Sequence, residues 1–555
     1  MLWNLLAATL LATSAVSPRG AVATAQPLAS EAGAAVLRSG GNAVDAAIAA
    51  AFTLAVVQPG SSGLGGGGFA LVYLAKDKSV HAIDFREVAP AATTAGLYVR
   101  DGKPRTDLSQ DGPLAVGVPG AVKGYVELAR RFGTKPLSEL TAAAEQLAWR
   151  GFQVGEAHVR AVQQRLPCLS ADPEAQRLFT VRDDEEKRRA PEPGERLVQR
   201  DMARTLHEVA LHGDAAFYRG RIARSIVETV QKAGGILTLK DLAAYNVRER
   251  APVEGTYRNW RIVSMPPPSS GGLIVLALLD VLEREDPRAG GYRPERFLHV
   301  MIEAEKRIYA RREHMGDPDF NPNMPNLVRE MSSKAWSDAL RAQIGEKATA
   351  AAAVQAQQEK TDTTHLSVID EEGNAVAITT TVNGAFGSCM VAKGTGIVLN
   401  DEMDDFAIAP DVPNLFGVRG GSENAPGPGK EPLSSMAPTF VFDPDGELRL
   451  SLGAAGGATI PTTVAQIISH FIDDKMPIDR ALAAPRLHNQ LFPDEVRVEA
   501  NGLEAATAAA LTARGHKLVF SDQILGAAQA VSSDPQTGYC AAAGEPRIGG
   551  AGAIP

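Results

Sequence analysis

The alternation of apolar and polar residues predicts helices and strands along much of the chain. Asn42 precedes an Ala-rich, almost wholly apolar run over 43–57, and Asp45 stands three residues after Asn42. This arrangement is typical of a capping box at the start of a buried helix. Pro59-Gly60 ends that helix, and residues 69–74 predict a strand.

The pattern changes near position 362, where a polar segment runs directly into two predicted strands. Residues 347–361 are rich in Ala, Gln and Lys without a core pattern, so we expect a mobile surface segment there. Thr363–Asp370 alternates like a strand, Glu371–Asn374 contains turn residues, and Ala375–Val382 predicts a second strand. A hairpin is therefore predicted over 363–382.

Further elements follow from apolar runs and from turn residues. Residues 273–282 predict an apolar helix, 449–452 predict a strand, and a helix is expected from about Thr462. Residues 407–433 hold five Pro and five Gly, which predicts a long ordered loop. Loops of that length are usually functional or disordered, so this one is a candidate part of a site.

Composition and charge exclude some classes of function. The chain has 555 residues, of which 45% are hydrophobic and 22% charged, with a net charge of −9. This is typical of a globular protein, and an acidic balance argues against nucleic-acid binding. The cysteines Cys168, Cys389 and Cys540 are odd in number and far apart, so we expect neither a disulfide framework nor a cysteine zinc site. Cys389 lies in an apolar run and is expected to be a buried small residue.

The N-terminal segment resembles the apolar region of a secretory signal peptide. Residues 2–15 are mostly apolar and end in small residues, but the run is too short to span a bilayer. The basic region that normally precedes such a run is missing, since the first arginine is Arg19. We expect residues 1–19 to be a signal peptide or an N-terminal extension, and the protein to be periplasmic or secreted. A cytoplasmic protein with a ragged N-terminus is the alternative.

No motif for a cofactor or a metal stands out. Gly63, Gly65 and Gly68 have the spacing of a dinucleotide fingerprint, but they follow a predicted helix and open a strand. The fingerprint requires the opposite order, so a close-packed turn is the better interpretation. No cofactor and no metal are expected.

The segment Asp362-Thr363-Thr364-His365 carries the most informative chemistry. Threonine favours strands, so taken alone the segment fits a structural role. If the bond before Thr363 breaks, however, its hydroxyl and a free α-amine lie on one residue. Because that amine has an ordinary pKa of about 7.7–8.0, it can act as the base that a threonine nucleophile needs.

At this point the chain resembles a known family, the γ-glutamyltranspeptidases (glutathione hydrolases) of the N-terminal-nucleophile superfamily. The resemblance extends from Gly20 to about Arg547. It rests on eight motifs: residues 40–47 (GGNAVDAA), 64–69, 84–90 (DFREVAP), 316–320 (GDPDF), 362–368 (DTTHLSV), 403–406 (MDDF), 432–436 (PLSSM) and 456–457. The family fold is α+β, a four-layer αββα sandwich.

The resemblance implies roles in the reaction for four residues. Thr363 would be the nucleophile for both self-cleavage and catalysis, and Thr381 on the partner strand would orient it. The backbone N–H groups of Gly456 and Gly457 would form the oxyanion hole, since glycine permits a turn that aims two amides at one point.

The resemblance also implies how the acyl donor is held. Arg86 would clamp its α-carboxylate through two parallel hydrogen bonds, helped by the hydroxyls of Ser434 and Ser435. Three further side chains would hold the α-ammonium group: Asn383, Glu402 and Asp405. Each residue alone fits a surface ion pair, a turn or a loop, but together they supply every group that an amino-acid-like donor requires.

The family relationship implies that one inactive chain becomes two fragments. Cleavage between Asp362 and Thr363 would give a large subunit over 20–362 and a small catalytic subunit over 363–555, together forming one intertwined unit. The donor would be glutathione or another γ-glutamyl compound. The γ-glutamyl-enzyme would then be hydrolysed, or its acyl group would pass to an amino-acid or dipeptide acceptor. No nucleic acid and no membrane span are implied.

Two positions depart from the family pattern, and three alternatives remain open. Loop 407–433 resembles a lid whose gating position often carries tyrosine, but here it carries Phe416, and Glu431 replaces a basic residue before Ser434. The alternatives are a cephalosporin or glutaryl acylase, a poly-γ-glutamate-processing enzyme, and a binding homologue that never matures. A glutaryl acylase has no ammonium to bind, so the Arg86, Asn383 and Asp405 set favours a γ-glutamyl donor.

Overall fold

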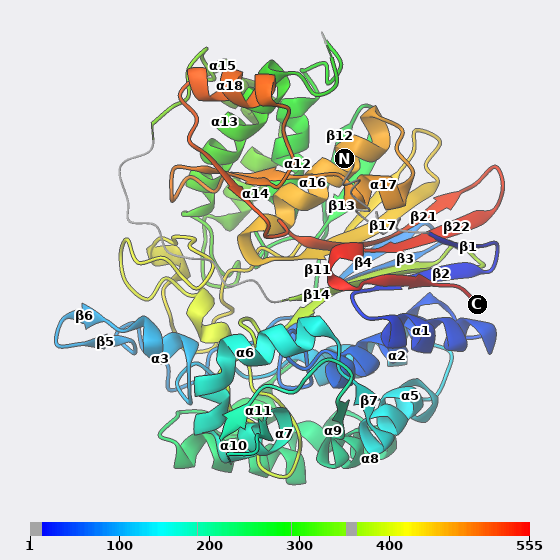
Figure 1. Cartoon of the computed structure of the whole chain (residues 1–555), viewed down its shortest axis with the longest axis vertical. Helices are drawn as coiled ribbons and strands as arrows, with labels where there is room; N and C mark the ends of the chain where they lie inside the picture. The colour runs from blue at the N-terminus through cyan, green and yellow to red at the C-terminus, as the bar shows by residue number, and fades with distance from the viewer. Residues whose placement is uncertain (1–13, 186, 290, 351–362) are drawn as a thin grey trace, which may run out of the picture.

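Two antiparallel sheets of seven strands each form the centre of the molecule (Figure 1). The structure is a computed structural model, and it describes residues 14–185, 187–289, 291–350 and 363–555. In spatial order the first sheet consists of β11 (Arg248–Arg250), β4 (Ser79–Phe85), β3 (Gly67–Leu74), β15 (Ala375–Thr381), β14 (Thr364–Asp370), β2 (Gly20–Thr24) and β23 (Ala551–Ala553). The second consists of β1 (Ala15–Ser17), β22 (Tyr539–Gly544), β21 (Ala527–Asp534), β17 (Leu448–Ala455), β16 (Thr439–Phe442), β13 (Trp260–Ser264) and β12 (Val253–Tyr257).

The sheets pack face to face, and helices cover both outer faces. Strand β14 of the first sheet contacts β17 and β21 of the second. Helices α1 (Pro27–Arg38) and α2 (Ala43–Val57) lie against the first sheet, and α12 (Gly271–Leu282) and α16 (Ile460–Asp473) lie against the second (Figure 1). The expected four-layer αββα sandwich is therefore confirmed.

The predicted buried helices are present; α2 has the predicted ends, whereas α12 begins at Gly271, two residues before its predicted start. In α2 the Asn42 side chain accepts a hydrogen bond from the Asp45 N–H, and the Asp45 carboxylate accepts one from the Asn42 N–H, each at 3.0 Å. This capping box satisfies two N–H groups that a helix N-terminus otherwise leaves unpaired. All residues of α2 and α12 are buried, which explains why their sequences are apolar on every side.

The predicted hairpin forms the middle of the first sheet. Strands β14 and β15 pair antiparallel with Thr364 opposite Thr380 and Leu366 opposite Ile378, and β14 also pairs with β2. Every residue of both strands is buried. Because sheet and helix layers cover both faces, the start of β14 is fixed on all sides, and this is where Thr363 lies.

The remaining helices surround this sandwich. Below the first sheet in Figure 1 lie α3 (Thr106–Gln110), α4 (Ala121–Phe132), α5 (Leu137–Arg150), α6 (Glu156–Ala171), α7 (Pro173–Phe179), α8 (Arg200–His212), α9 (Asp214–Tyr218), α10 (Arg221–Lys232) and α11 (Leu239–Ala244). On the side of the second sheet lie α13 (Glu295–Arg312), α14 (Met324–Met331), α15 (Lys334–Ala342), α17 (Ile478–Ala483) and α18 (Ala505–Ala513).

The expectation that no disulfide would form was wrong. Cys168 near the end of α6 and Cys389 are disulfide-bonded, with Cα atoms 5.9 Å apart, while Cys540 is a free, buried thiol. The two cysteines are 221 residues apart in sequence, and they meet only because α6 packs beside the segment that follows β15. Cys389 is buried, as predicted.

Several expectations fall on parts of the chain that the structure does not describe. The expected mobile segment lies mostly within 351–362, outside the described residues, as does Asp362 on one side of the expected cleavage bond. Of the expected leader, residues 1–13 lie outside them, whereas Ala15–Ser17 form β1, which pairs with β22. Among the described residues, no helix is long and apolar enough to cross a membrane.

Candidate active site

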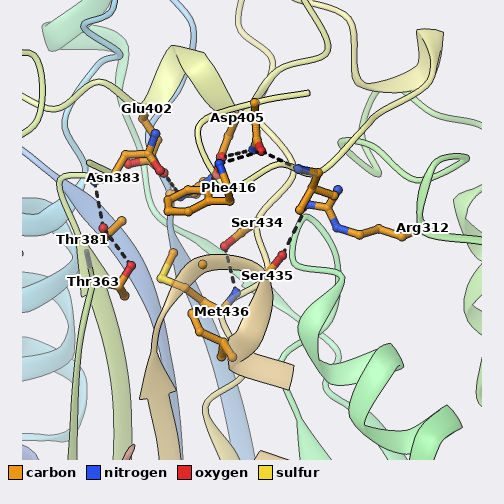
Figure 2. A pocket seen from close by; sticks show the side chains of 15 residues that line it. Arg312, Thr363, Thr381, Asn383, Glu402, Asp405, Phe416, Ser434, Ser435 and Met436 are labelled. Carbon is orange, nitrogen blue, oxygen red and sulfur yellow. Dashed lines mark hydrogen bonds and ion pairs between the residues drawn. The ribbon is translucent and has the colours of Figure 1, made fainter. Parts of the chain in front are cut away.

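One pocket collects nearly all the side chains that the sequence singled out (Figure 2). It is lined by ten of the expected residues: Arg86, Thr363, Thr381, Asn383, Glu402, Asp405, Phe416, Ser434, Ser435 and Gly457. Gly456 precedes Gly457 in the turn that leads from β17 to α16. These residues come from segments up to 371 positions apart, between Arg86 and Gly457, so the fold rather than local sequence brings them together.

The hydroxyl of Thr363 lies beside the hydroxyl of Thr381, with 3.3 Å between the two oxygens. The register that sets Thr364 opposite Thr380 places these two residues as neighbours at the end of the hairpin. The Thr381 oxygen also accepts a hydrogen bond of 2.8 Å from the Asn383 N–H. The Thr381 hydroxyl is thus oriented by the backbone that follows it, and it can in turn orient Thr363 (Figure 2).

His365 lies close in sequence to Thr363 but is not placed to act as its base. Its two ring nitrogens are bonded to the hydroxyls of Thr379 at 2.9 Å and Ser367 at 3.0 Å. Complete burial lowers the pKa of His365 to about 3, so the ring is neutral. The ring packs across the sheet interface against Gly453 of β17, where a larger residue would collide with it. Its role is therefore structural.

No histidine, lysine or cysteine lines the pocket among the described residues. The carboxylates that line it, Glu402 and Asp405, both form ion pairs with Arg86.

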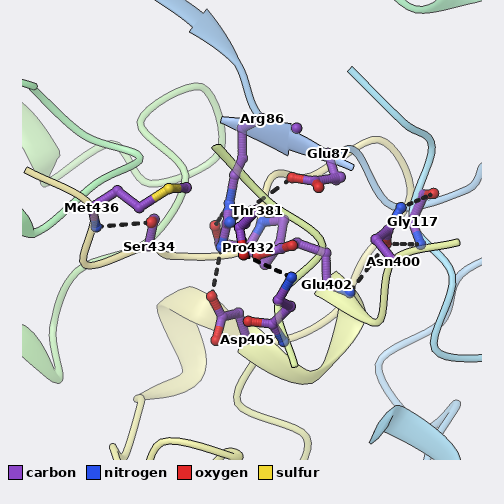
Figure 3. Close-up of polar contacts among 12 residues, drawn as sticks. Arg86, Glu87, Gly117, Thr381, Asn400, Glu402, Asp405, Pro432, Ser434 and Met436 are labelled. Carbon is purple, nitrogen blue, oxygen red and sulfur yellow. Dashed lines mark hydrogen bonds and ion pairs between the residues drawn. The ribbon is translucent and has the colours of Figure 1, made fainter. Parts of the chain in front are cut away.

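Arg86 is the centre of a buried network of charges (Figure 3). It follows β4 and is only 1% exposed. Its Nε–H donates to the Pro432 carbonyl at 3.1 Å, one terminal nitrogen binds Glu402, and the other binds Asp405 at 2.6 Å. A guanidinium group carries five N–H bonds, so two of them remain for a ligand after these three contacts. Arg86 also lines the pocket, so its guanidinium group is part of the pocket wall.

The carboxyl groups around Arg86 carry raised pKa values. Burial raises the pKa of Glu402 to about 7, and Arg86 opposes that effect. Burial, with the neighbouring Glu402 carboxylate, raises the pKa of Glu87 well above its ordinary value. Glu87 is fully buried, with its carboxylate 3.9 Å from Arg86, and neither of its oxygens has a hydrogen-bond partner among the described residues. We infer that Glu87 stays protonated at neutral pH.

The sequence did not point to Arg312, which is a second guanidinium group at the pocket wall (Figure 2). It is the last residue of α13 and is 3% exposed. It donates to the Ser270 hydroxyl at 3.0 Å and to the Ser435 hydroxyl at 3.4 Å, but it forms no ion pair with any described residue. A buried cation without an anionic partner is costly, so this position favours an anionic ligand. Arg312 is one of several charged residues in α13, so the sequence alone does not distinguish it.

The pocket is charge-balanced when Glu87 is neutral. Arg86 and Arg312 supply two positive charges, and the ionised forms of Glu402 and Asp405 supply two negative charges. A zwitterion, such as the α-ammonium and α-carboxylate of an amino acid, matches such a site because each of its charges can lie against the opposite one.

The glycine pair follows β17, at the point where only glycine fits. Gly456 has φ of 133° and Gly457 has φ of 55°, conformations that L side chains rarely adopt. A Cβ atom at Gly457 would also collide with the Phe416 ring, which lies directly over it. Gly457 thus lines the same pocket as Thr363.

Phe416 covers the pocket in this structure. Its side chain is 6% exposed, and the free volume of the pocket is about 20 Å³, or space for roughly one water molecule. Three contacts fix the segment around it. The Asn414 oxygen accepts from the Phe416 N–H at 3.0 Å, the Asn414 amide donates to Asp405 at 2.8 Å, and the Gln490 amide donates to the Phe416 carbonyl at 3.0 Å. As it stands, the pocket has no room for a ligand of the size of an amino acid.

Glu431, which departs from the family pattern, belongs to a structural network outside the pocket. It is 1% exposed and binds Arg248, together with Arg250 at 2.9 Å. Its backbone N–H donates to Asp317 at 2.8 Å. These contacts anchor the chain three residues before Ser434, so the acidic residue is compensated by two arginines.

Among the described residues, one group could in principle hold a metal ion: Asp111, Cys168 and Cys389. Both sulfur atoms are already joined in the disulfide, and the Arg165 guanidinium binds the Asp111 carboxylate. The positive charge of Arg165 beside Asp111 disfavours the binding of a metal cation there.

Comparison with known proteins gives a consistent result. The family model for gamma-glutamyltranspeptidase matches residues 29–554. The chain is 40% identical over 536 residues to the glutathione hydrolase proenzyme of Escherichia coli K12, covering 95% of this chain and 90% of the relative. It is 37% identical to the glutathione hydrolase proenzyme of Pseudomonas aeruginosa, covering 99% of this chain and 97% of that one.

A solved structure shares the whole architecture. The crystal structure of a cephalosporin acylase from Bacillus halodurans matches with a TM-score of 0.85 at 28% identity, covering 100% of this chain and 99% of that chain. The agreement extends across both sheets and their helical layers, so the relationship concerns the entire fold.

Proposed function

The chain belongs to the γ-glutamyltranspeptidase family, and on that premise we propose that it is a proenzyme which cleaves itself before Thr363 and then acts as a glutathione hydrolase and γ-glutamyltransferase. The observation that carries the proposal is the pairing of the Thr363 and Thr381 hydroxyls in one pocket with Arg86 and Gly457. It is an enzyme of the N-terminal-nucleophile class.

Maturation begins with the Thr363 hydroxyl. It attacks the carbonyl carbon of Asp362 and converts the peptide bond into an ester, and water then hydrolyses the ester. The products are a large fragment ending at Asp362 and a small fragment of 193 residues over 363–555 (555 − 362 = 193). The position of Thr363 at the start of a central strand supports this step, because the nucleophile is held rigidly before cleavage as well as after it.

Donor recognition uses the charged wall of the pocket. We assign the α-carboxylate of the glutamyl group to the two remaining N–H bonds of Arg86 and to the hydroxyls of Ser434 and Ser435, with Arg312 as a further cation behind Ser435. The α-ammonium group lies against three side chains in this assignment: Asn383, Glu402 and Asp405. The balanced charges of the pocket support a zwitterionic ligand.

Acyl transfer then follows in two steps. The free α-amine of Thr363 takes the proton of its own hydroxyl, and the oxygen attacks the γ-carbonyl of the donor. The oxyanion is stabilised by the N–H groups of Gly456 and Gly457, and the amine returns the proton to the leaving nitrogen. Water hydrolyses the γ-glutamyl-enzyme, or the amine of an amino acid or dipeptide takes the acyl group.

An acylase acting on cephalosporins or glutaryl amides is the second candidate, since the solved structure with the same fold is described as a cephalosporin acylase. A glutaryl group has a carboxylate but no ammonium. The Glu402 and Asp405 carboxylates in the pocket would then lack a positive partner on the ligand, so the observed charges favour the γ-glutamyl donor. Turnover of γ-glutamyl and glutaryl anilides, measured side by side, separates the two functions.

The location outside the cytoplasm is also a proposal. A disulfide between Cys168 and Cys389 supports a periplasmic or secreted protein, because disulfides persist mainly in oxidising compartments. The apolar run over residues 2–15 supports the same location.

The function is tested by replacing the nucleophile. Thr363→Ala is expected to remain one folded, inactive chain, and Thr363→Ser is expected to mature, because it keeps a hydroxyl. Thr364→Ala is the matched control, since that hydroxyl bonds Gln58 on the opposite side of the strand. Gel electrophoresis under reducing conditions, which open the Cys168–Cys389 disulfide between the fragments, reports cleavage, and N-terminal sequencing of the small fragment should give Thr-Thr-His-Leu-Ser. An active Thr363→Ala protein, or a small fragment that begins elsewhere, contradicts the proposal.

A further inference from the structure

The segment that follows β15, residues 382–391, has a backbone that is costly to maintain. Asn383 has φ of 77°, Phe386 of 58° and Cys389 of 61°, in the left-handed region that non-glycine residues rarely occupy. Such conformations are unfavourable and persist only where the surroundings fix them. Because Asn383 lines the donor pocket, its position depends on whatever holds this segment.

One side of the segment is held by the pocket itself. The Asn383 amide donates to the Asp401 carbonyl at 3.0 Å, and the Gly384 N–H donates to the Asp401 carboxylate at 2.8 Å. The Asn383 N–H donates to Thr381, as described above. These contacts join the segment to the residues that carry the proposed chemistry.

The other side is held by α6 and α7. Cys389 is disulfide-bonded to Cys168 of α6, and Arg165 of the same helix donates to the Gly387 carbonyl at 3.1 Å. The Phe386 ring packs against Phe179 of α7, with ring centres 4.9 Å apart. The disulfide is the only covalent link between this helical layer and the segment among the described residues.

We propose that the Cys168–Cys389 disulfide is a redox-sensitive positioning element for Asn383, so that its reduction by a small thiol weakens donor binding. This inference rests on the proposed function, because Asn383 is assigned there to the α-ammonium group of the donor. Neither cysteine touches the pocket, so the disulfide acts through the segment.

The difference in exposure between Cys168 and Cys389 determines which sulfur atom the reductant attacks. Cys389 is 2% exposed, whereas Cys168 is partly exposed. An incoming thiolate therefore attacks the sulfur of Cys168, forms a mixed disulfide and releases the Cys389 thiolate, which takes up a proton. A second thiol attacks the mixed disulfide at the sulfur of the first. The products are one small-molecule disulfide and two protein thiols.

Glutathione itself belongs to the class of reductant that this step requires. In a reducing compartment the chain would keep the disulfide open and bind donor weakly, and in an oxidising compartment it would close the disulfide and bind donor well. The device would thus limit hydrolysis of intracellular glutathione before the protein reaches its final location.

The experiment measures donor KM and kcat of the matured enzyme with a γ-glutamyl anilide, before and after treatment with dithiothreitol. Reduction is expected to raise KM about tenfold, the effect of one lost hydrogen bond, with kcat changed less than about twofold. Oxidised dithiothreitol should restore KM. Thiol titration in denaturant should give one thiol before reduction and three after it.

Two variants separate this effect from general damage. Cys168→Ser should show the raised KM without reductant and no further response to it. Cys540→Ser, which removes the free buried thiol, should keep the full response. Because both variants are compared with and without reductant, a small loss of folding stability in either does not imitate the pattern.

Three results would overturn the inference. The first is an unchanged donor KM in protein whose titration gives three thiols. The second is a tenfold fall in kcat on reduction with a constant KM. The third is one zinc ion bound per molecule at Asp111, Cys168 and Cys389 in the purified protein. The Asn383→Ala variant tests the proposed function and the redox inference separately. If this variant leaves donor KM unchanged, the assignment of Asn383 in the proposed function fails. If it raises KM while reduction has no effect, only the redox inference fails.

Discussion

Replacement of Arg86 by lysine tests the donor site most directly. Arg86 is fully buried and makes three contacts at once, with Glu402, Asp405 and the Pro432 carbonyl, while two N–H bonds remain for the donor. Lysine keeps the positive charge, but its ammonium is a single point with three N–H bonds. It cannot bind two carboxylates, a carbonyl and a ligand carboxylate from one position.

The size of the effect follows from these contacts. Loss of one partner from a buried, hydrogen-bonded charge pair costs about 2–5 kcal/mol, and retention of the charge places Arg86→Lys near the lower end, at about 2–3 kcal/mol. Donor KM is therefore expected to rise about 30- to 150-fold. Self-cleavage should survive, because it uses no donor.

The assay is steady-state hydrolysis of a γ-glutamyl anilide, with gel electrophoresis to confirm maturation. Arg250→Lys is the matched control. Arg250 is another largely buried arginine that binds three carboxylates, Asp84, Asp319 and Glu431, but it does not line the pocket. The control is expected to lose some stability but to keep its donor KM. An unchanged KM in Arg86→Lys, with normal maturation, would refute the assignment of Arg86.

Three other changes probe separate parts of the pocket. Because the pKa of Glu402 is raised to about 7, the carboxyl loses its charge as pH falls below 7, so donor KM should rise on the acid side, and Glu402→Gln should flatten that limb of the profile of KM against pH. Phe416→Tyr adds a hydroxyl to the cover, and a new hydrogen bond worth about 0.5–1.5 kcal/mol should shift the ratio of hydrolysis to transfer by up to about tenfold. An identical ratio would argue against a lid role for loop 407–433. Gly457→Ala places a Cβ against the Phe416 ring and should lower kcat about 100-fold if the turn forms the oxyanion hole, whereas Gly446→Ala, at φ of 84° with open space around it, should leave kcat unchanged.

The sequence predicted those parts of the fold whose pattern is local. The helix over 43–57 with its capping box, the hairpin that begins near Thr363 and the strand that starts near Arg449 were all found where apolar periodicity and turn residues indicated. Motifs also predicted much of the pocket, since Arg86, Thr363 and Asp405 lie within short, distinctive stretches, whereas Thr381, Asn383 and Glu402 were expected only from the family resemblance. The structure adds their mutual placement, while their roles in the reaction stay predictions.

Features that depend on distant contacts could not be predicted from the pattern. Cys168 and Cys389 are 221 residues apart, and nothing in either neighbourhood identifies the other as its partner. Arg312 differs from an ordinary helix-end arginine only because α13 buries it without an anionic partner. Asn414 was one polar residue in a long loop until the fold placed its amide between Asp405 and Phe416. In each case the informative quantity is burial, which tertiary packing determines.

The order of strands in the first sheet affects how the fragments of the mature enzyme stay together and how the enzyme unfolds. In the first sheet, β14 and β15 of the expected small fragment lie between β3 and β2 of the large one, and β23 pairs with β2 from the other side. The fragments are thus woven together, so they cannot separate by simple dissociation, and dilution should not pull them apart. After unfolding, the two fragments would remain joined only through the Cys168–Cys389 disulfide, and the one-chain folding route would no longer exist. We therefore expect the unfolding rate to determine the lifetime of the cleaved enzyme, and we expect denaturation to be irreversible.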